Sequence, residues 1–165
     1  MNIAQKKAIQ FIFKYKLNKN TLSRDTIQSV LERQGYRVFR FCRNGSSSDE
    51  VQREIQQRNL LERIQKLNTD CFTHIRNNDR AIFVNDRLSE ETEQYVLLHE
   101  QGHISYGHLS HHILDGTQYE QEANAFAFYV MHYINLKEKF RGLFLMGGVL
   151  LIAFYLIMLL VLLMR

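Results

Sequence analysis

The pentapeptide His99-Glu100-Gln101-Gly102-His103 places two histidines and a glutamate at a spacing that suits metal chemistry. In a helix, residues four apart lie one turn apart on the same face, so both imidazoles can reach one metal ion. Glu100 lies one step round the helix, from where it can reach a water on the metal. In a zinc hydrolase, two imidazole nitrogens and a third protein ligand hold Zn²⁺, and the fourth position carries water. The sequence therefore predicts a zinc site with Glu100 as general base.

The residues around this motif predict the helix that such a site requires. Ser89 is a suitable N-cap, and glutamates fill the first turn after it, where carboxylates interact favourably with the helix dipole. Residues 96–98 and Ile104 supply an apolar face. Gly102 costs about 1 kcal/mol relative to alanine inside a helix, which indicates that another element packs closely there.

A third metal ligand is expected downstream, where the apolar spacing from residue 117 again predicts a helix. Glu120 and Glu122 point about 200° apart on a helix, so only one of them can face the metal. Glu120 shares its face with Asn124, whose side chain can hydrogen-bond a ligand histidine. Glu120 is therefore the favoured ligand, although the sequence leaves Glu122 open. The rival ligands are the histidines that follow the motif: His108, His111 and His112.

The remaining pattern predicts an α+β domain with a short sheet. The strand before the motif helix is expected to give a sheet edge beside the site, where an extended peptide can add. The chain has a formal net charge of only +4, and nothing basic marks a recognition helix, so direct nucleic-acid binding is not expected. Helices are predicted at residues 1–18, 23–34 and 51–68, and strands at 36–42, 71–76 and 81–85, the last two as a hairpin around Asn77-Asn78-Asp79.

A run without charged residues closes the sequence at residues 142–164. At about 1.5 Å per residue, this run is long enough for a helix to cross a bilayer core of about 30 Å. Lys137, Lys139 and Arg141 precede the run and only Arg165 follows it, a bias that places the preceding residues in the cytoplasm. We therefore expect a cytoplasmic domain over residues 1–141 and one C-terminal transmembrane helix that anchors it to the membrane.

Residues 21–131 resemble the ImmA/IrrE family of metallopeptidases. The resemblance rests on the helix and strand at 22–41, the strand at 81–85, the H-E-x-G-H motif with His108, and the run 120–127, which reads E-x-E-A-N-x-F-A. The resemblance implies a small zincin-like fold in which His99, His103 and Glu120 bind zinc and Glu100 is the catalytic base. It also implies a protein substrate, because family members act on repressor-like regulators.

The function expected from these features is zinc-dependent hydrolysis of peptide bonds in a protein or peptide substrate. Glu100 would take the proton of the attacking water and later hand it to the leaving amine. Asn124, His108 and Tyr106 are candidates for hydrogen-bonding the ligand histidines or for donating to the oxyanion. The alternative is a membrane-tethered binding module with a purely structural zinc site, in which Glu100→Gln would leave the function intact.

Overall fold

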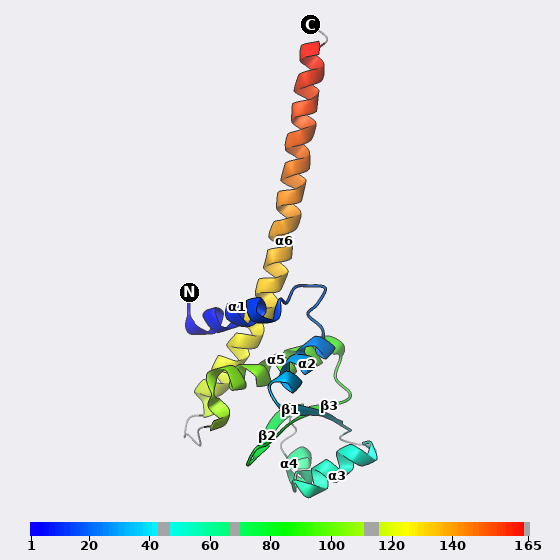
Figure 1. The fold of residues 1–165 in the computed structure, drawn as a ribbon, viewed down its shortest axis with the longest axis vertical. Helices are drawn as coiled ribbons and strands as arrows, with labels where there is room; N and C mark the ends of the chain where they lie inside the picture. The colour runs from blue at the N-terminus through cyan, green and yellow to red at the C-terminus, as the bar shows by residue number, and fades with distance from the viewer. Residues whose placement is uncertain (43–46, 67–69, 111–115, 164–165) are drawn as a thin grey trace.

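The computed structural model describes residues 1–42, 47–66, 70–110 and 116–163. Their regular elements surround a short sheet, and the longest helix extends well beyond the other elements (Figure 1). The expected α+β fold is confirmed for this part of the chain. In chain order the elements are α1 Ile3–Tyr15, α2 Arg24–Arg33, β1 Tyr36–Phe41, α3 Asp49–Gln57, α4 Leu61–Lys66, β2 Cys71–Arg76, β3 Asp79–Asn85, α5 Glu90–Tyr106, the 3-10 turn η1 His108–Ser110 and α6 Gly116–Leu163.

The sheet of the described residues has the strand order β1-β3-β2. β1 runs parallel to β3, with Tyr36 opposite Arg80, and β2 runs antiparallel to β3, with Thr73 opposite Ile82. The strand that directly precedes the motif helix is therefore the central one. The expectation that β3 would form the sheet edge is wrong, because β3 pairs on both sides. The edge strand nearest the motif helix is β2, the first strand of the predicted hairpin.

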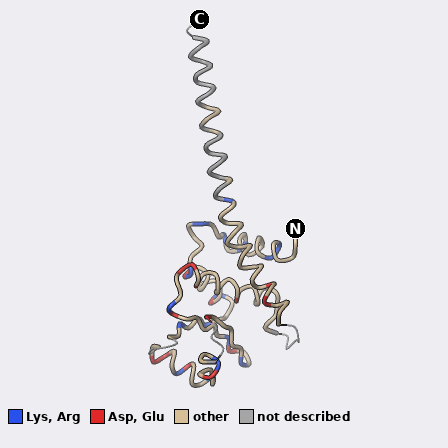
Figure 2. Tube along the Cα trace, turned by 180° about the vertical axis from the view of Figure 1, so that it is seen from behind, with Lys and Arg blue, Asp and Glu red and all other residues tan. Residues whose placement is uncertain are grey.

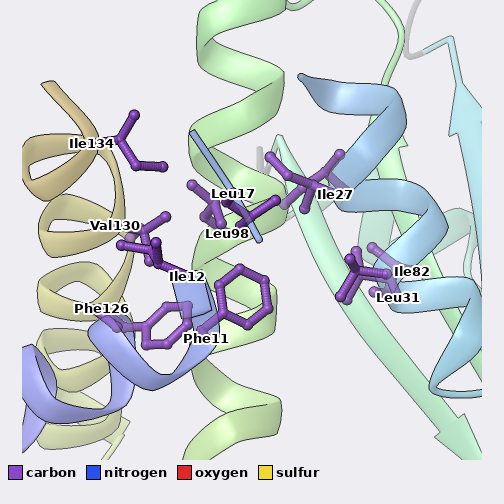
Figure 3. Close-up of a cluster of buried hydrophobic side chains, with 14 of the residues drawn as sticks. Phe11, Ile12, Leu17, Ile27, Leu31, Ile82, Leu98, Phe126, Val130 and Ile134 are labelled. Atoms are coloured by element: carbon purple, nitrogen blue, oxygen red, sulfur yellow. The ribbon is translucent and has the colours of Figure 1, made fainter. Parts of the chain in front are cut away.

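Alternating side chains of β3 divide the apolar interior into two cores. Ile82 and Val84 belong to the larger core, which the sheet shares with α1, α2, α5 and α6. Figure 3 shows α5 in the middle of this core, between α6 and α1 on one side and α2 and the strands on the other. Ala81 and Phe83 face the opposite side and pack with residues of α3 and α4. The motif helix is thus held in the centre of the larger core.

The predicted helix over residues 51–68 is two helices in the structure. Asn59 adopts a left-handed backbone conformation (φ 56°), and the Leu60 amide donates to the Ile55 carbonyl at 3.0 Å. This is the hydrogen-bonding pattern of a Schellman motif, which ends a helix, and asparagine tolerates the left-handed region better than most residues. Helix α3 therefore ends before Asn59, and α4 starts at Leu61.

Ion pairs fix α3 to the sheet. Arg37 on β1 pairs with Glu54 on α3 and with Asp79 on β3, each at 2.9 Å. Arg58 pairs with the same two carboxylates. Figure 2 shows basic and acidic residues intermixed over this end of the molecule. Because Arg58 is largely buried, its ion pairs join α3 to β3 beside the smaller core, the one that contains Ala81 and Phe83.

Helix α6 is continuous from Gly116 to Leu163, 48 residues in length (Figure 1). In the part of the chain that the structure describes, no helix combines the length and the apolar character needed to cross a membrane. This corrects the predicted C-terminal transmembrane helix, and with it the predicted single-pass membrane localisation with a cytoplasmic domain. The expectation treated residues 142–164 as an independent uncharged segment, whereas residues 142–163 continue the helix whose first half packs in the larger core. The domain boundary expected at residue 141 stays a prediction.

Candidate metal centre

Helix α5 is positioned by its caps and by buried polar contacts. The Ser89 side chain accepts a hydrogen bond from the Thr92 amide, and Gly107 closes the helix in a left-handed conformation (φ 76°). Glu93, buried on α5, pairs with Arg40 on β1 at 2.7 Å. The caps and the pair fix the rotation of α5 relative to the sheet, and this rotation decides where its histidines point.

The two motif histidines converge on one point. His99 Nε2 and His103 Nε2 lie 3.0 Å apart, as expected for residues one helical turn apart on one face. Glu120 on α6 completes a triangle, with Oε2 at 3.2 Å from His99 Nε2 and Oε1 at 3.3 Å from His103 Nε2. Two elements far apart in the sequence therefore bring together the three side chains that the sequence singled out as ligands.

The spacing of these atoms matches what a small tetrahedral metal ion requires. Bonds of about 2.0–2.1 Å at the tetrahedral angle place ligand atoms about 3.3–3.4 Å apart. The observed separations of 3.0–3.3 Å are close to that value. Two imidazole nitrogens and one carboxylate are also the donor set that zinc takes in peptidases. The three side chains thus fit a zinc ion in both spacing and donor chemistry.

Glu122 does not join this triangle. Its Oε2 accepts a hydrogen bond from His108 Nε2 at 2.9 Å, on a different face of α6 from Glu120. Hydrogen bonds from Gln118 and His108 hold the pKa of the Glu122 carboxyl below its usual range, even though partial burial opposes them. The geometry separates the two glutamates as the helical spacing predicted, with Glu120 beside the motif histidines and Glu122 beside His108.

Each motif histidine has a partner for its other ring nitrogen. His99 Nδ1 lies 2.9 Å from Asn124 Oδ1, an acceptor, so His99 carries its proton on Nδ1 and leaves Nε2 free as a ligand. His103 Nδ1 lies 3.0 Å from His108 Nδ1, and His108 in turn donates to Glu122. Asn124 and His108 therefore lie against the Nδ1 atoms of the two motif histidines, where such contacts orient an imidazole ring, and not against the Nε2 atoms that face Glu120.

The His108 ring packs against two tyrosine rings. The Tyr106 and Tyr119 rings both stack on the His108 ring, with centroids 5.1 Å and 4.2 Å from that of His108. The Lys7 ammonium from α1 lies over the Tyr106 ring and donates to the Ser105 carbonyl at 2.7 Å. Burial raises the pKa of the Tyr106 hydroxyl. Of the candidate oxyanion donors, Tyr106 and His108 therefore lie in this stack. The rival ligands His111 and His112 fall outside the described residues.

The side chain of Glu100 is almost fully enclosed, with 5% of the residue exposed. Burial raises the pKa of its carboxyl group, and a hydrogen bond from Thr73 on β2 acts in the opposite direction. Burial also lowers the pKa of His103 to about 4, and the neighbouring His99 contributes in the same direction. His103 is therefore neutral at physiological pH, which is the form that binds a metal.

Sequence reasoning missed two participants in this site. Thr73 contacts Glu100 from 27 residues away, and Lys7 reaches the end of α5 from the first helix. No local pattern marks either residue, because each contact depends on how distant elements pack. The pairing of His108 with Glu122 was open to prediction in principle, since both follow the motif and have complementary chemistry.

The fold and the site together define a metallopeptidase-like domain. The family model of the IrrE N-terminal-like domain, a peptidase family, matches residues 51–140, which is more than half of the chain. The protein therefore belongs to the ImmA/IrrE family, as its motifs suggested. No curated protein and no solved structure matches the chain.

Asn124→Leu should weaken zinc binding about 10- to 100-fold, because the loss of a hydrogen bond to a ligand histidine typically has that effect on metal affinity. Leucine keeps the size of the side chain but cannot accept the proton of His99 Nδ1. Competition with a chromophoric chelator measures the affinity. The matched control is Gln121→Leu, which removes an exposed amide from the same helix. Equal affinities for the two variants would show that the Asn124 contact does not orient His99.

Proposed function

We propose that this protein is a zinc-dependent endopeptidase in which His99, His103 and Glu120 hold the ion and Glu100 is the general base. The observation that carries the proposal is the grouping of three side chains from two helices: His99 Nε2 and His103 Nε2 lie 3.0 Å apart, and each lies within 3.3 Å of an oxygen of Glu120. A zinc ion bound there would polarise the scissile carbonyl and lower the pKa of a water molecule to about 7.

The open character of the site favours catalysis over a purely structural role. Structural zinc sites are closed by four protein ligands, whereas catalytic sites keep one position for water. Among the described residues the metal centre groups three candidate ligands, one fewer than a closed structural site has. The Glu120 side chain is 59% exposed, so solvent and substrate can approach the centre from its side. This argues against the alternative of a binding module with structural zinc.

Glu100 is suited to move the proton that the reaction requires. Burial raises the pKa of its carboxyl group towards the pH at which the enzyme works. A general base is most effective when its pKa lies near that pH. Glu100 takes a proton from the attacking water and then delivers it to the nitrogen of the leaving amine. The peptide bond breaks, and the carboxyl product gains the oxygen of the water.

The substrate is proposed to bind as an extended segment along β2. In the described residues β2 is an edge strand of the sheet, and its Thr73 contacts the candidate base. Free backbone groups at a sheet edge pair with an added strand, which would bring a peptide bond past the metal centre. The family resemblance favours a regulatory, repressor-like protein as the source of this segment.

Glu100→Gln tests the proposal. In the full chain, we expect one equivalent of zinc in both parent and variant, because glutamine keeps the shape of the side chain and Glu100 is not a proposed ligand. Casein cleavage should fall by a factor of about 10²–10⁴, the usual contribution of a general base. The matched control is Glu91→Gln, the same change at an exposed position of α5. The control should cleave like the parent.

Three results would contradict the proposal in different ways. A parent protein without zinc would show that the triangle does not hold the ion. Zinc in the parent without cleavage of casein or of a co-expressed repressor would favour the binding module. Equal cleavage by parent and Glu100→Gln would show that another group is the base.

A further inference from the structure

A threonine hydroxyl on the sheet edge contacts the candidate base directly. Thr73 Oγ1 donates a hydrogen bond to Glu100 Oε2 at 2.5 Å, and this contact joins β2 to α5. Because side chains alternate along a strand, Thr73 faces α5, while its neighbour Phe72 belongs to the core on the opposite side of the sheet. The contact therefore follows from the placement of β2 beside the motif helix.

This hydrogen bond distinguishes the two oxygens of the Glu100 carboxylate. A bond to Oε2 restrains rotation of the carboxylate about its terminal bond, a torsion that is otherwise broad. Oε1 is then left to accept a proton from water. The surroundings make the restraint effective, since Glu100 is enclosed in the interior, where a hydrogen bond to a charged group is short and strong.

We propose that Thr73 is the positioning residue that holds Glu100 in the orientation required for proton transfer. This inference rests on the proposed function, because it assigns Thr73 a role through the base of that reaction. Thr73 also lies on the strand proposed to bind the substrate. The strand β2 would then set both the position of the substrate backbone and the orientation of the Glu100 carboxylate. The distance between the peptide bond and the base would therefore be fixed by one strand.

Two substitutions separate the hydroxyl from the shape of the side chain. Thr73→Val keeps the branched shape and the strand preference of threonine but removes the donor. Thr73→Ser keeps the donor and removes the methyl group. In the full chain, we expect kcat for casein cleavage to fall about 10- to 100-fold in Thr73→Val, with KM and zinc content unchanged. Thr73→Ser should stay within about 3-fold of the parent, because an orienting hydroxyl is restored.

A double-mutant cycle tests whether Thr73 acts through Glu100. If it does, adding Thr73→Val to Glu100→Gln should change the residual cleavage rate less than about 2-fold, because the group it orients as a base is already gone. A full 10-fold loss in both backgrounds would overturn the proposal, since Thr73 would then act independently of the base.

The remaining outcomes distinguish this inference from the proposed function. Loss of cleavage in both Thr73→Val and Thr73→Ser, with zinc retained, would show that activity depends on how the whole Thr73 side chain packs. That result would overturn the role of the hydroxyl. Parent-like cleavage by Thr73→Val would overturn it as well while leaving the peptidase intact. A parent that binds zinc and cleaves nothing would instead contradict the proposed function, and with it the assignment of Thr73.

Discussion

Glu120→Gln should weaken zinc binding by more than about 100-fold and abolish casein cleavage, whereas Glu122→Gln should keep zinc affinity within about 10-fold of the parent. The first change neutralises the carboxylate whose Oε2 lies 3.2 Å from His99 Nε2 and whose Oε1 lies 3.3 Å from His103 Nε2. Loss of a ligand exceeds the 10- to 100-fold effect typical of groups that only support ligands. The second change alters a residue that contacts the metal centre only through His108.

The pair of variants is an internal control, because both substitutions neutralise a carboxylate on the same turn of α6, on different faces of the helix. Any general effect of charge or helix stability should appear in both. Zinc affinity is measured by chelator competition at constant pH, with cleavage measured on the same samples. The reverse order of affinities would identify Glu122 as the third ligand. Equal losses in both variants would show a general effect of the lost charge and would contradict the assignment of Glu120 alone as the third ligand.

The grouping of His99, His103 and Glu120 could be expected from the sequence because part of its geometry is local. A spacing of four residues on a capped helix determines that His99 and His103 face the same way, whatever surrounds them. The shared face of Glu120 and Asn124 is equally local, and in the structure Glu120 lies beside both histidines and Asn124 beside His99.

The features that the sequence did not predict depend on tertiary packing. Strand order is one of them: β3 pairs on both sides, and only the complete sheet shows that β2 lies at its edge beside α5. The contact between Thr73 and Glu100 is a consequence of that order. The break at Asn59 is different, because a left-handed residue inside an otherwise helical pattern is a weak local signal that the apolar spacing concealed.

The close approach of α5 and α6 connects the fold to the metal centre. Gly102 was expected to mark a point of close packing, and the structure confirms it. A Cβ atom at this position would lie 2.8 Å from Ala123 Cα and 3.0 Å from the Ala123 carbonyl oxygen. Both are backbone atoms, so they cannot move aside as a flexible side chain would. Since Gly102 adjoins His103, and Ala123 follows Glu120 by three residues, this contact sets the distance between the proposed ligands.

Gly102→Ala should therefore destabilise the protein by about 1–3 kcal/mol, the usual cost of overpacking, even though alanine in a helix is otherwise favoured over glycine by about 1 kcal/mol. Zinc affinity should fall as well, because α6 must move away from α5 and carry Glu120 with it. Urea unfolding of the metal-free protein measures the first effect, and chelator competition measures the second. The matched control is Gly116→Ala at the start of α6, where an added Cβ meets no atom of the described residues within 4 Å. That variant should be as stable as the parent or slightly more so. If Gly102→Ala were as stable as Gly116→Ala and bound zinc equally well, the spacing of the two helices would not depend on this glycine.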